Sequence, residues 1–274
     1  MPLCEARTPP EVRPGAAPGV RKDYRGRPPA ITRLRLPKTP IAAWFGLKLG
    51  QKLALMLGLK LGLLLGAAAA LAATPPLPAL QAALDVAVID YESGRLAQAR
   101  RAFESLSRQG VAAADYNLAV MHLRDELPQA SRQRARQLLT RASRAGFVTA
   151  QLMLARSLEV GDFGRRDLRL AHQWYELAAE SGSVEAQVAM GTAFFLGRGR
   201  PKDPARAAHW FREGAKGGDV GAMYLLASLY EQGDGVERDL RLARYWYDIA
   251  ARHGDEAAPA KVIELDAKAA TAPP

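Results

Sequence analysis

The side chains that most often carry out chemistry in proteins are sparse in this chain. Its four histidines are His122, His172, His209 and His253, and no two of them have the i, i+4 spacing that places two metal ligands on one helix face. Cys4 is the only cysteine, so the rest of the chain can form neither an internal disulfide nor a cysteine nucleophile. We therefore expect no metal site, no cofactor and no catalytic residue.

Three glutamates, Glu159, Glu185 and Glu231, suggest an alternative that involves sugar chemistry. Acid-catalysed glycoside cleavage needs two carboxyl groups held about 5–10 Å apart across one bond. These three lie in different stretches of the chain and have no matching partner. A glycan-binding or glycan-modifying accessory protein of the cell envelope is kept as an alternative interpretation.

Two glycine-containing stretches, Gly161–Gly164 and Gly197–Arg200, could be mistaken for loops that bind phosphate. Such loops require a preceding strand and a particular glycine spacing. Here the glycines recur once in each unit of a longer pattern, which indicates turn residues.

The longer pattern is a repeat with a period of 36 residues, seen first at Trp174, Trp210 and Trp246. The units 148–183, 184–219 and 220–255 align without a gap, and a weaker unit precedes them. Many other positions match, among them Ala150, Ala186 and Ala222; Leu154, Met190 and Leu226; Ala155, Gly191 and Ala227; and Ala171, Ala207 and Ala243. Each tryptophan lies on an apolar stripe beside alanines, which favours core packing between helices over a sugar-stacking platform.

Each unit has apolar residues at helical spacing on both sides of a glycine-rich break, which predicts a helix, a turn and a second helix. Asp203 and Asp239 stand where a side-chain oxygen can cap the second helix. Gly254 and its counterparts stand where a left-handed residue ends it. One such hairpin cannot bury its apolar face alone, whereas a stack of about five hairpins can.

The last unit reads AMYLLASLYEQGDGVERDLRLARYWYDIAARHG from Ala222 to Gly254. It resembles the Sel-1-like repeat, a longer relative of the tetratricopeptide repeat, whose pattern is roughly A-x-x-x-L-G-x-x-Y-x-x-G-x-G-V-x-x-D-x-x-x-A-x-x-W-Y-x-x-A-A-x-x-G. The resemblance is strong over residues 148–255, weaker over 111–147 and absent from the first 73. It implies an all-α protein, a right-handed α-solenoid of stacked antiparallel helix hairpins that binds proteins or peptides as an adaptor or scaffold and has no catalytic residue.

These observations predict the organisation of the whole chain. The segments are a basic leader with a signal peptide or membrane anchor (1–73), a first hairpin like a tetratricopeptide repeat (78–110), four repeats (111–147, 148–183, 184–219 and 220–255), a C-terminal capping helix (256–268) and a disordered tail (269–274). In the capping helix, we expect Val262, Ile263 and Leu265 to lie on one side.

By analogy with the tetratricopeptide groove, we expect the partner to bind a concave surface lined by the first helices. The candidate residues are Tyr116, Arg156, Glu159, Thr192, Phe195, Tyr224, Ser228 and Glu231. Phe195 and Tyr224 are the predicted anchors, and Arg156 and Glu231 the predicted selectivity residues. The alternative is that these aromatic side chains only pack against the next first helix.

The formal net charge of +10 is concentrated in the leader. Residues 1–72 contain 12 Lys and Arg but 3 Asp and Glu, which leaves 26 basic and 25 acidic residues in the remainder. The repeats themselves therefore have little long-range attraction for phosphate, and we expect no binding to nucleic acid.

Lysines precede the apolar stretch Leu61–Ala73, which ends in small residues before Thr-Pro-Pro. This order is typical of a signal peptide. We predict cleavage after Ala72 or Ala73 and a periplasmic or secreted monomer. The alternative is an uncleaved inner-membrane anchor at Leu53–Ala73, since about 20 residues span a bilayer; contact with the membrane is expected only in that case.

Overall fold

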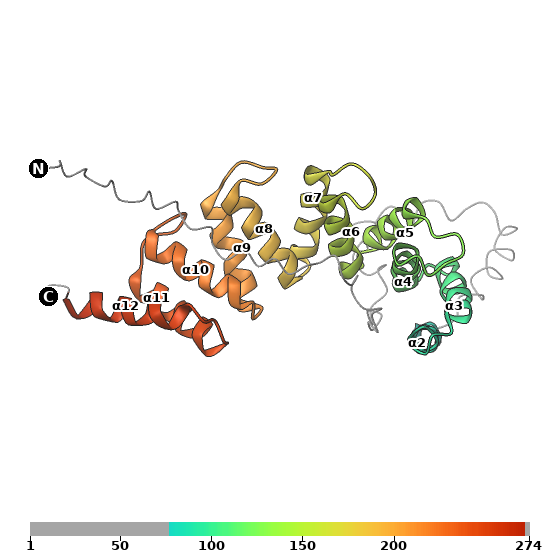
Figure 1. Cartoon of the computed structure of the whole chain (residues 1–274), viewed down its shortest axis with the longest axis horizontal. Coiled ribbons are helices and arrows are strands. Elements are labelled where there is room, and N and C mark those ends of the chain that lie inside the picture. The colour runs from blue at the N-terminus through green and yellow to red at the C-terminus, as the bar shows by residue number, and fades with distance from the viewer. Residues whose placement is uncertain (1–76, 272–274) are drawn as a thin grey trace, which may run out of the picture. The chain divides into compact units, whose positions relative to one another are not determined.

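The computed structural model describes residues 77–271, which form eleven α-helices and no strand (Figure 1). The helices are α2 (Leu77–Glu92), α3 (Leu96–Arg108), α4 (Ala112–Leu123), α5 (Arg132–Arg144), α6 (Val148–Val160), α7 (Leu168–Glu180), α8 (Val184–Leu196), α9 (Pro204–Lys216), α10 (Val220–Gln232), α11 (Leu240–Arg252) and α12 (Ala258–Thr271). The predicted leader, 1–73, lies outside the described residues.

Consecutive helices pair into the hairpins α2/α3, α4/α5, α6/α7, α8/α9 and α10/α11, and α12 follows alone. Each first helix contacts the second helix of its own hairpin, and from α4 onward it also contacts the second helix of the hairpin before it. The hairpins accordingly follow one another in chain order in Figure 1. This arrangement is an α-solenoid of stacked helix hairpins, and the predicted fold class is confirmed.

The second helices begin where the sequence predicts their caps. The Asp203 side chain accepts a hydrogen bond from the backbone N–H of Arg206 at 3.0 Å, and that of Asp239 accepts one from Leu242 at 3.0 Å. Asp167 caps α7 in the same way. Each cap satisfies a backbone donor that the first helical turn leaves without a partner.

Small residues allow the two helices of a hairpin to approach closely. A Cβ added to Gly191 on α8 would lie 2.6 Å from Cδ1 of Phe211 on α9, so only a glycine fits beneath this ring. Phe211 is 0% exposed, and its counterparts Tyr175 and Tyr247 are 5% and 1% exposed. The tryptophans that precede them also pack against the core, as predicted, although Trp174 and Trp246 are only partly buried.

The turn of each later repeat packs against the start of the preceding second helix. Gly199 has a φ of 68° and a Cβ added to it would lie 2.9 Å from Cβ of Leu168, the first residue of α7. One repeat later, Gly235 has a φ of 74° and a Cβ there would overlap the backbone of Pro204, the first residue of α9. These turns therefore set the distance between consecutive hairpins.

Gly235→Ala is expected to lower the free energy of unfolding by more than about 1 kcal/mol, because alanine disfavours positive φ and its Cβ would meet backbone. Gly221→Ala is the matched control, since Gly221 is exposed in the first turn of α10 and a Cβ there finds only Asp219 Oδ1, at 3.4 Å. That change should be neutral or stabilising by up to about 1 kcal/mol. Urea unfolding measures both, and equal effects would contradict the packing role of the turn.

The same inter-repeat contact holds a buried histidine. His172 on α7 is 6% exposed, and its Nδ1 accepts a hydrogen bond from Nε of Arg200 at 3.3 Å. Burial and the positive charge of Arg200 lower the pKa of this imidazole below its usual range. The folded state therefore favours neutral His172.

This lowered pKa predicts a loss of stability in acid. A histidine with a depressed folded-state pKa stabilises the fold above its unfolded pKa of about 6.5, and the contribution is lost as pH falls below that value. Between about pH 7 and about pH 5, the unfolding free energy should fall more steeply for the native chain than for His172→Gln. His253→Gln, exposed at the end of α11, controls for removal of a histidine. Parallel curves for the native chain and His172→Gln would refute the role of His172.

The C-terminal helix covers the last hairpin. α12 packs against α11, with Ala258 and Leu265 buried and Val262 partly buried. Ile263 is 70% exposed, so its predicted place beside Leu265 is wrong: the two residues are separated by about 200° around the helix. The helix includes residues 269–271, for which the sequence predicts disorder.

Candidate protein interface on the first helices

The structure divides the eight predicted groove residues into those held within the framework and those on an open face. Tyr116 belongs to the framework. It is 0% exposed and its ring lies 5.6 Å from that of Phe147, so it is a core residue and its prediction as a surface contact is wrong. The physical reason is that α4, unlike the later first helices, is buried over almost its whole length.

Two of the predicted glutamates bind the second helix of their own hairpin. The hydroxyl of Tyr175 on α7 donates to Glu159 on α6 at 2.8 Å, and that of Tyr247 on α11 donates to Glu231 on α10 at 2.9 Å. Burial, together with the adjacent carboxylate, raises the pKa of both tyrosines far above the usual range. Both hydroxyls therefore remain neutral donors, and the two glutamates act first as hairpin contacts.

The intervening repeat makes the same contact with apolar residues. Phe195 on α8 occupies the position equivalent to Glu159 and Glu231, and Phe211 occupies that of the two tyrosines. The two phenyl rings meet edge to face with centroids 6.3 Å apart. The hairpins thus match the polarity of the two partners, Glu with Tyr or Phe with Phe. Phe195 is consequently a framework contact rather than a free anchor.

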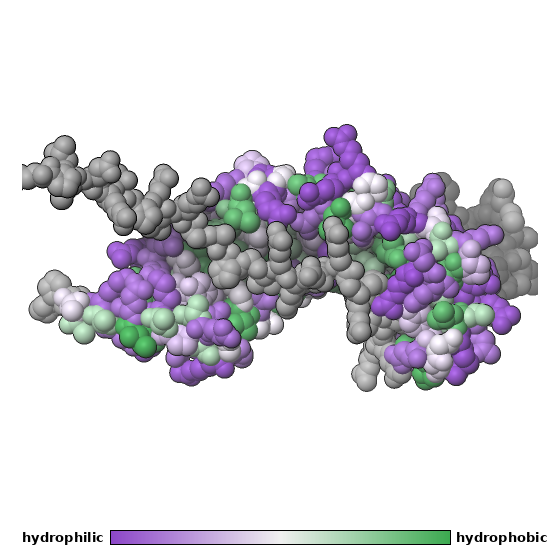
Figure 2. All heavy atoms as spheres, viewed as in Figure 1, coloured by the Kyte–Doolittle hydropathy of each residue, from purple (hydrophilic) through white to green (hydrophobic). Residues whose placement is uncertain are grey.

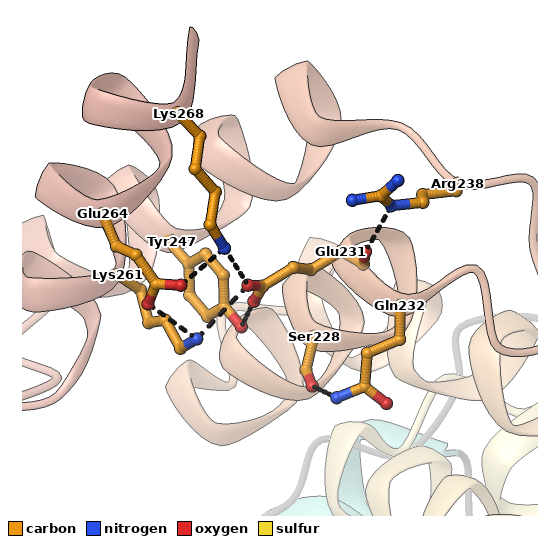
Figure 3. Close-up of polar contacts among 8 residues, drawn as sticks. All are labelled: Ser228, Glu231, Gln232, Arg238, Tyr247, Lys261, Glu264 and Lys268. Atoms are coloured by element: carbon orange, nitrogen blue, oxygen red, sulfur yellow. Dashed lines mark hydrogen bonds and ion pairs between the residues drawn. The ribbon is translucent and has the colours of Figure 1, made fainter. Parts of the chain in front are cut away.

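Glu231 also binds the C-terminal helix (Figure 3). Its carboxylate lies 3.3 Å from Nζ of Lys261 and 3.7 Å from Nζ of Lys268, both on α12. Glu264 joins the same cluster through both lysines, and its hydrogen bond with Lys261 is the first cause of the raised pKa of that lysine. Sequence reasoning missed these lysines, because the period of the repeat ends before α12. The cluster therefore attaches the capping helix α12 to α10, the first helix of the last hairpin.

The exposed face of each first helix is not the side that carries Glu159 or Glu231. It includes the residue that follows each of these glutamates. Thr149, Leu152, Arg156 and Val160 recur every three or four residues on α6 and are partly or fully exposed. The equivalent residues are Glu185, Val188, Thr192 and Leu196 on α8 and Gly221, Tyr224, Ser228 and Gln232 on α10. We call these twelve residues the first-helix face. One residue corresponds to a rotation of about 100°, which turns Glu159 toward α7 and Val160 toward solvent.

Four predicted residues lie on the first-helix face: Arg156, Thr192, Tyr224 and Ser228. Arg156 forms an ion pair with Glu185 of the next repeat, which links α6 to α8. The ring of Tyr224 is 5.0 Å from that of Tyr247, so this side chain is half framework and half surface. Val160 and Leu196, which sequence reasoning missed, are 64% and 57% exposed. Helical spacing could have identified them, because each lies four residues after a predicted face residue, Arg156 or Thr192.

Two hydroxyl residues of this face form hydrogen bonds within their own helices. Thr192 Oγ1 donates to the carbonyl of Val188 at 2.8 Å, and Ser228 Oγ accepts from Nε2 of Gln232 at 3.1 Å. The face therefore combines exposed apolar side chains with short polar ones. Such a mixed surface is suited to contact with a protein chain.

The three glutamates of the glycan alternative are each held by other side chains of this chain. Glu159 binds Tyr175 and lies 3.6 Å from Arg198, while Glu185 pairs with Arg156. Glu231 contacts a separate set of side chains on α11 and α12. Glu231 is thus separate from the other two, whereas Arg156, the partner of Glu185, also interacts with Tyr175, the donor to Glu159. Within residues 77–271, no group of three or more His, Cys, Asp or Glu side chains is placed to hold a metal ion.

Stacked helix hairpins with a recurring turn and cap define a protein of the helical-repeat class. The family described as Sel1 repeat matches residues 112–147, 148–183, 184–219 and 220–255, which is more than half of the chain. The chain therefore belongs to the Sel1 repeat family. Proteins of this family generally mediate protein–protein interactions and are typically non-catalytic.

Two solved structures are similar in sequence and fold. A Sel1 repeat protein from Oxalobacter formigenes is 28% identical with a TM-score of 0.62, over 69% of this chain and 77% of that one. The protective antigen c5321 of uropathogenic Escherichia coli, which has the same repeat fold, is 29% identical with a TM-score of 0.61, over 68% of this chain. The match spans 41% of that antigen's length. No curated protein sequence matches the chain.

The Glu–Tyr and Phe–Phe pairs at the hairpin contact predict that the two positions are energetically coupled, which a double-mutant cycle can measure. Phe211→Tyr should lower the unfolding free energy by about 1–3 kcal/mol, because it buries a hydroxyl with no acceptor. Adding Phe195→Glu should recover most of this loss, since it recreates the Glu–Tyr pair of the neighbouring repeats. Guanidinium unfolding of the native chain, both single variants and the double variant gives the coupling energy. Simple additivity of the two changes would contradict this assignment.

Proposed function

We propose that this protein is a non-enzymatic interaction scaffold of the bacterial cell envelope and that the first-helix face binds a protein or peptide. The observation that carries the proposal is the pair Val160 and Leu196, which are 64% and 57% exposed at equivalent positions of adjacent repeats. Single exposed apolar residues are ordinary on protein surfaces, whereas a recurrent set on one face indicates contact with a partner.

The variation between repeats supports the same proposal. At three successive positions of the first-helix face, α6 has Leu, Arg and Val, α8 has Val, Thr and Leu, and α10 has Tyr, Ser and Gln. The alanines, the capping aspartates and the turn glycines do not vary in this way. A solenoid keeps its framework and changes the surface that recognises its partner.

The proposed location in the envelope depends on the leader. Its lysines, the apolar stretch Leu61–Ala73 and the small residues at its end support export with cleavage after Ala72 or Ala73. Retention of the leader as an inner-membrane anchor is the competing proposal. No helix within residues 77–271 has the length and apolar character needed to cross a bilayer. Cell fractionation with mass measurement of the mature chain distinguishes the two: loss of the leader supports export, and an intact leader in the membrane supports the anchor.

Partner capture tests the first-helix face. Val160→Asp with Leu196→Asp should reduce capture of a specific envelope protein by at least about tenfold, because both changes place charge at the apolar contacts. Ile263→Asp is the matched control, since Ile263 is 70% exposed on α12, outside the face. Quantitative mass spectrometry after affinity capture compares the three chains.

Circular dichroism and thermal unfolding must show that the double variant keeps its helices and its stability. These substitutions are preferable to truncation of Phe195 and Tyr224, whose rings pack against Phe211 and Tyr247. Equal capture by the native chain and the double variant would exclude the first-helix face as the binding surface.

A further inference from the structure

A recessed surface lies between the second helices α3 and α5, beside the turn that joins α4 to α5. It is a cleft of about 710 Å³, within the size range of ligand-binding pockets. Arg100 and Arg108 of α3 line one wall, and Arg134 and Arg141 of α5 line the other. None of the cleft's lining residues belongs to the first-helix face, so it does not depend on the function proposed above.

The lining of this cleft departs from the pattern of the later repeats. Leu138 on α5 lines it, at the position that holds Trp174, Trp210 and Trp246 in the later repeats. The equivalent junction between α9 and α11 also has a cleft, but from α11 only the first three residues, 240–242, line it. That cleft has a volume of about 700 Å³ although Trp246 is present in α11, so the α3/α5 cleft is distinguished by its lining and not by its size.

Positive charge dominates the cleft. Its lining includes four arginines and the single carboxylate of Glu104, whose distance from Nη1 of Arg100 is 3.9 Å. Arg141 is held by the buried Asp115 and also donates to Ser107 at 2.5 Å. Arg108 and Arg134 form no ion pair within residues 77–271.

A neutral histidine contributes a donor to the same wall. The backbone N–H of Ser131 donates to Nδ1 of His122 at 3.2 Å, so the proton of the neutral ring resides on Nε2. Burial and the charge of Arg134 lower the pKa of this imidazole, which keeps it neutral. His122 lines the cleft together with Leu118 and Leu127. The lining of the cleft thus combines guanidinium and imidazole donors with apolar side chains.

We propose that this cleft binds an acidic segment of a protein partner in which carboxylates flank an apolar side chain. Arg108 and Arg134 pair with the carboxylates, since a guanidinium presents a planar fork of donors that matches them. Leu127, a partly exposed apolar residue of the lining, contacts the apolar side chain. A peptide is favoured over nucleic acid because a phosphate backbone requires an extended basic track, whereas this cleft is short, partly apolar and contains Glu104.

The test uses a fluorescein-labelled peptide with the sequence Asp-Leu-Glu-Asp-Phe and fluorescence anisotropy with the purified full chain. Arg108→Glu and Arg134→Glu should each weaken binding by at least about tenfold. Arg101→Glu on α3 and Arg136→Glu on α5 are matched controls, because both residues are exposed on the same helices and do not line the cleft. The controls should weaken binding less than about threefold.

Two further comparisons address the nature of the ligand. The uncharged peptide Asn-Leu-Gln-Asn-Phe should bind at least about tenfold more weakly than the acidic one. Leu127→Asp should also weaken binding at least about tenfold, because it places a carboxylate at the apolar contact of an acidic ligand. If this variant does not fold, the arginine variants and their controls still decide the result.

Several results would overturn the proposal. These are no binding of the acidic peptide, equal losses for the cleft and control arginines, or binding of a single-stranded DNA oligonucleotide as tight as that of the peptide. The last result would identify the cleft as a general site for polyanions. Because the variants leave the first-helix face intact, failure here would not affect the outcome of the partner-capture experiment.

Discussion

Close approach of the two helices in each hairpin is the constraint on which the rest of the structure depends. The first helices have small residues where the second helices meet them, namely Ala155, Gly191 and Ala227. Phe211 lies so close to Gly191 that no side chain fits between them. Because each first helix also contacts the second helix of the preceding hairpin, any displacement at one contact passes to the next hairpin. Stability in such a stack is a sum of hairpins and their nearest neighbours.

Beside these small residues, the first and second helices of a hairpin are joined either by a hydrogen bond or by an apolar ring contact. Tyr175 and Tyr247 donate to glutamates, whereas Phe211 meets Phe195. A residue that varies between repeats is therefore not automatically a binding residue, since its variation can be compensated within the same hairpin. Variation points to recognition at exposed positions that the hairpin does not compensate, such as Val160 and Leu196 of the first-helix face.

The two proposed binding surfaces arise from different irregularities of one framework. On the first-helix face, the framework is intact and the exposed side chains change, with Val160 and Leu196 as the most open apolar positions. In the cleft between α3 and α5, the lining changes, because four arginines gather there and Leu138 stands where the later repeats have tryptophan. Figure 2 shows that most of the visible described surface is hydrophilic and that apolar residues appear on it as small separate patches. Recognition of a partner would then combine a few apolar contacts with charged ones.

The sequence by itself determined the class of fold, because a 36-residue period with helical spacing, capping aspartates and turn glycines is compatible only with repeated helix hairpins. It did not determine which side of a first helix faces solvent. Neighbouring residues differ by about 100° around a helix, so the choice between Glu159 and Val160 required the position of the second helix. The burial of Tyr116 and the attachment of Lys261 to Glu231 likewise depended on tertiary contacts, with α4 enclosed and α12 packed against α11. Periodicity is a property of the sequence itself, whereas the exposure of a residue depends on how neighbouring helices and hairpins cover it.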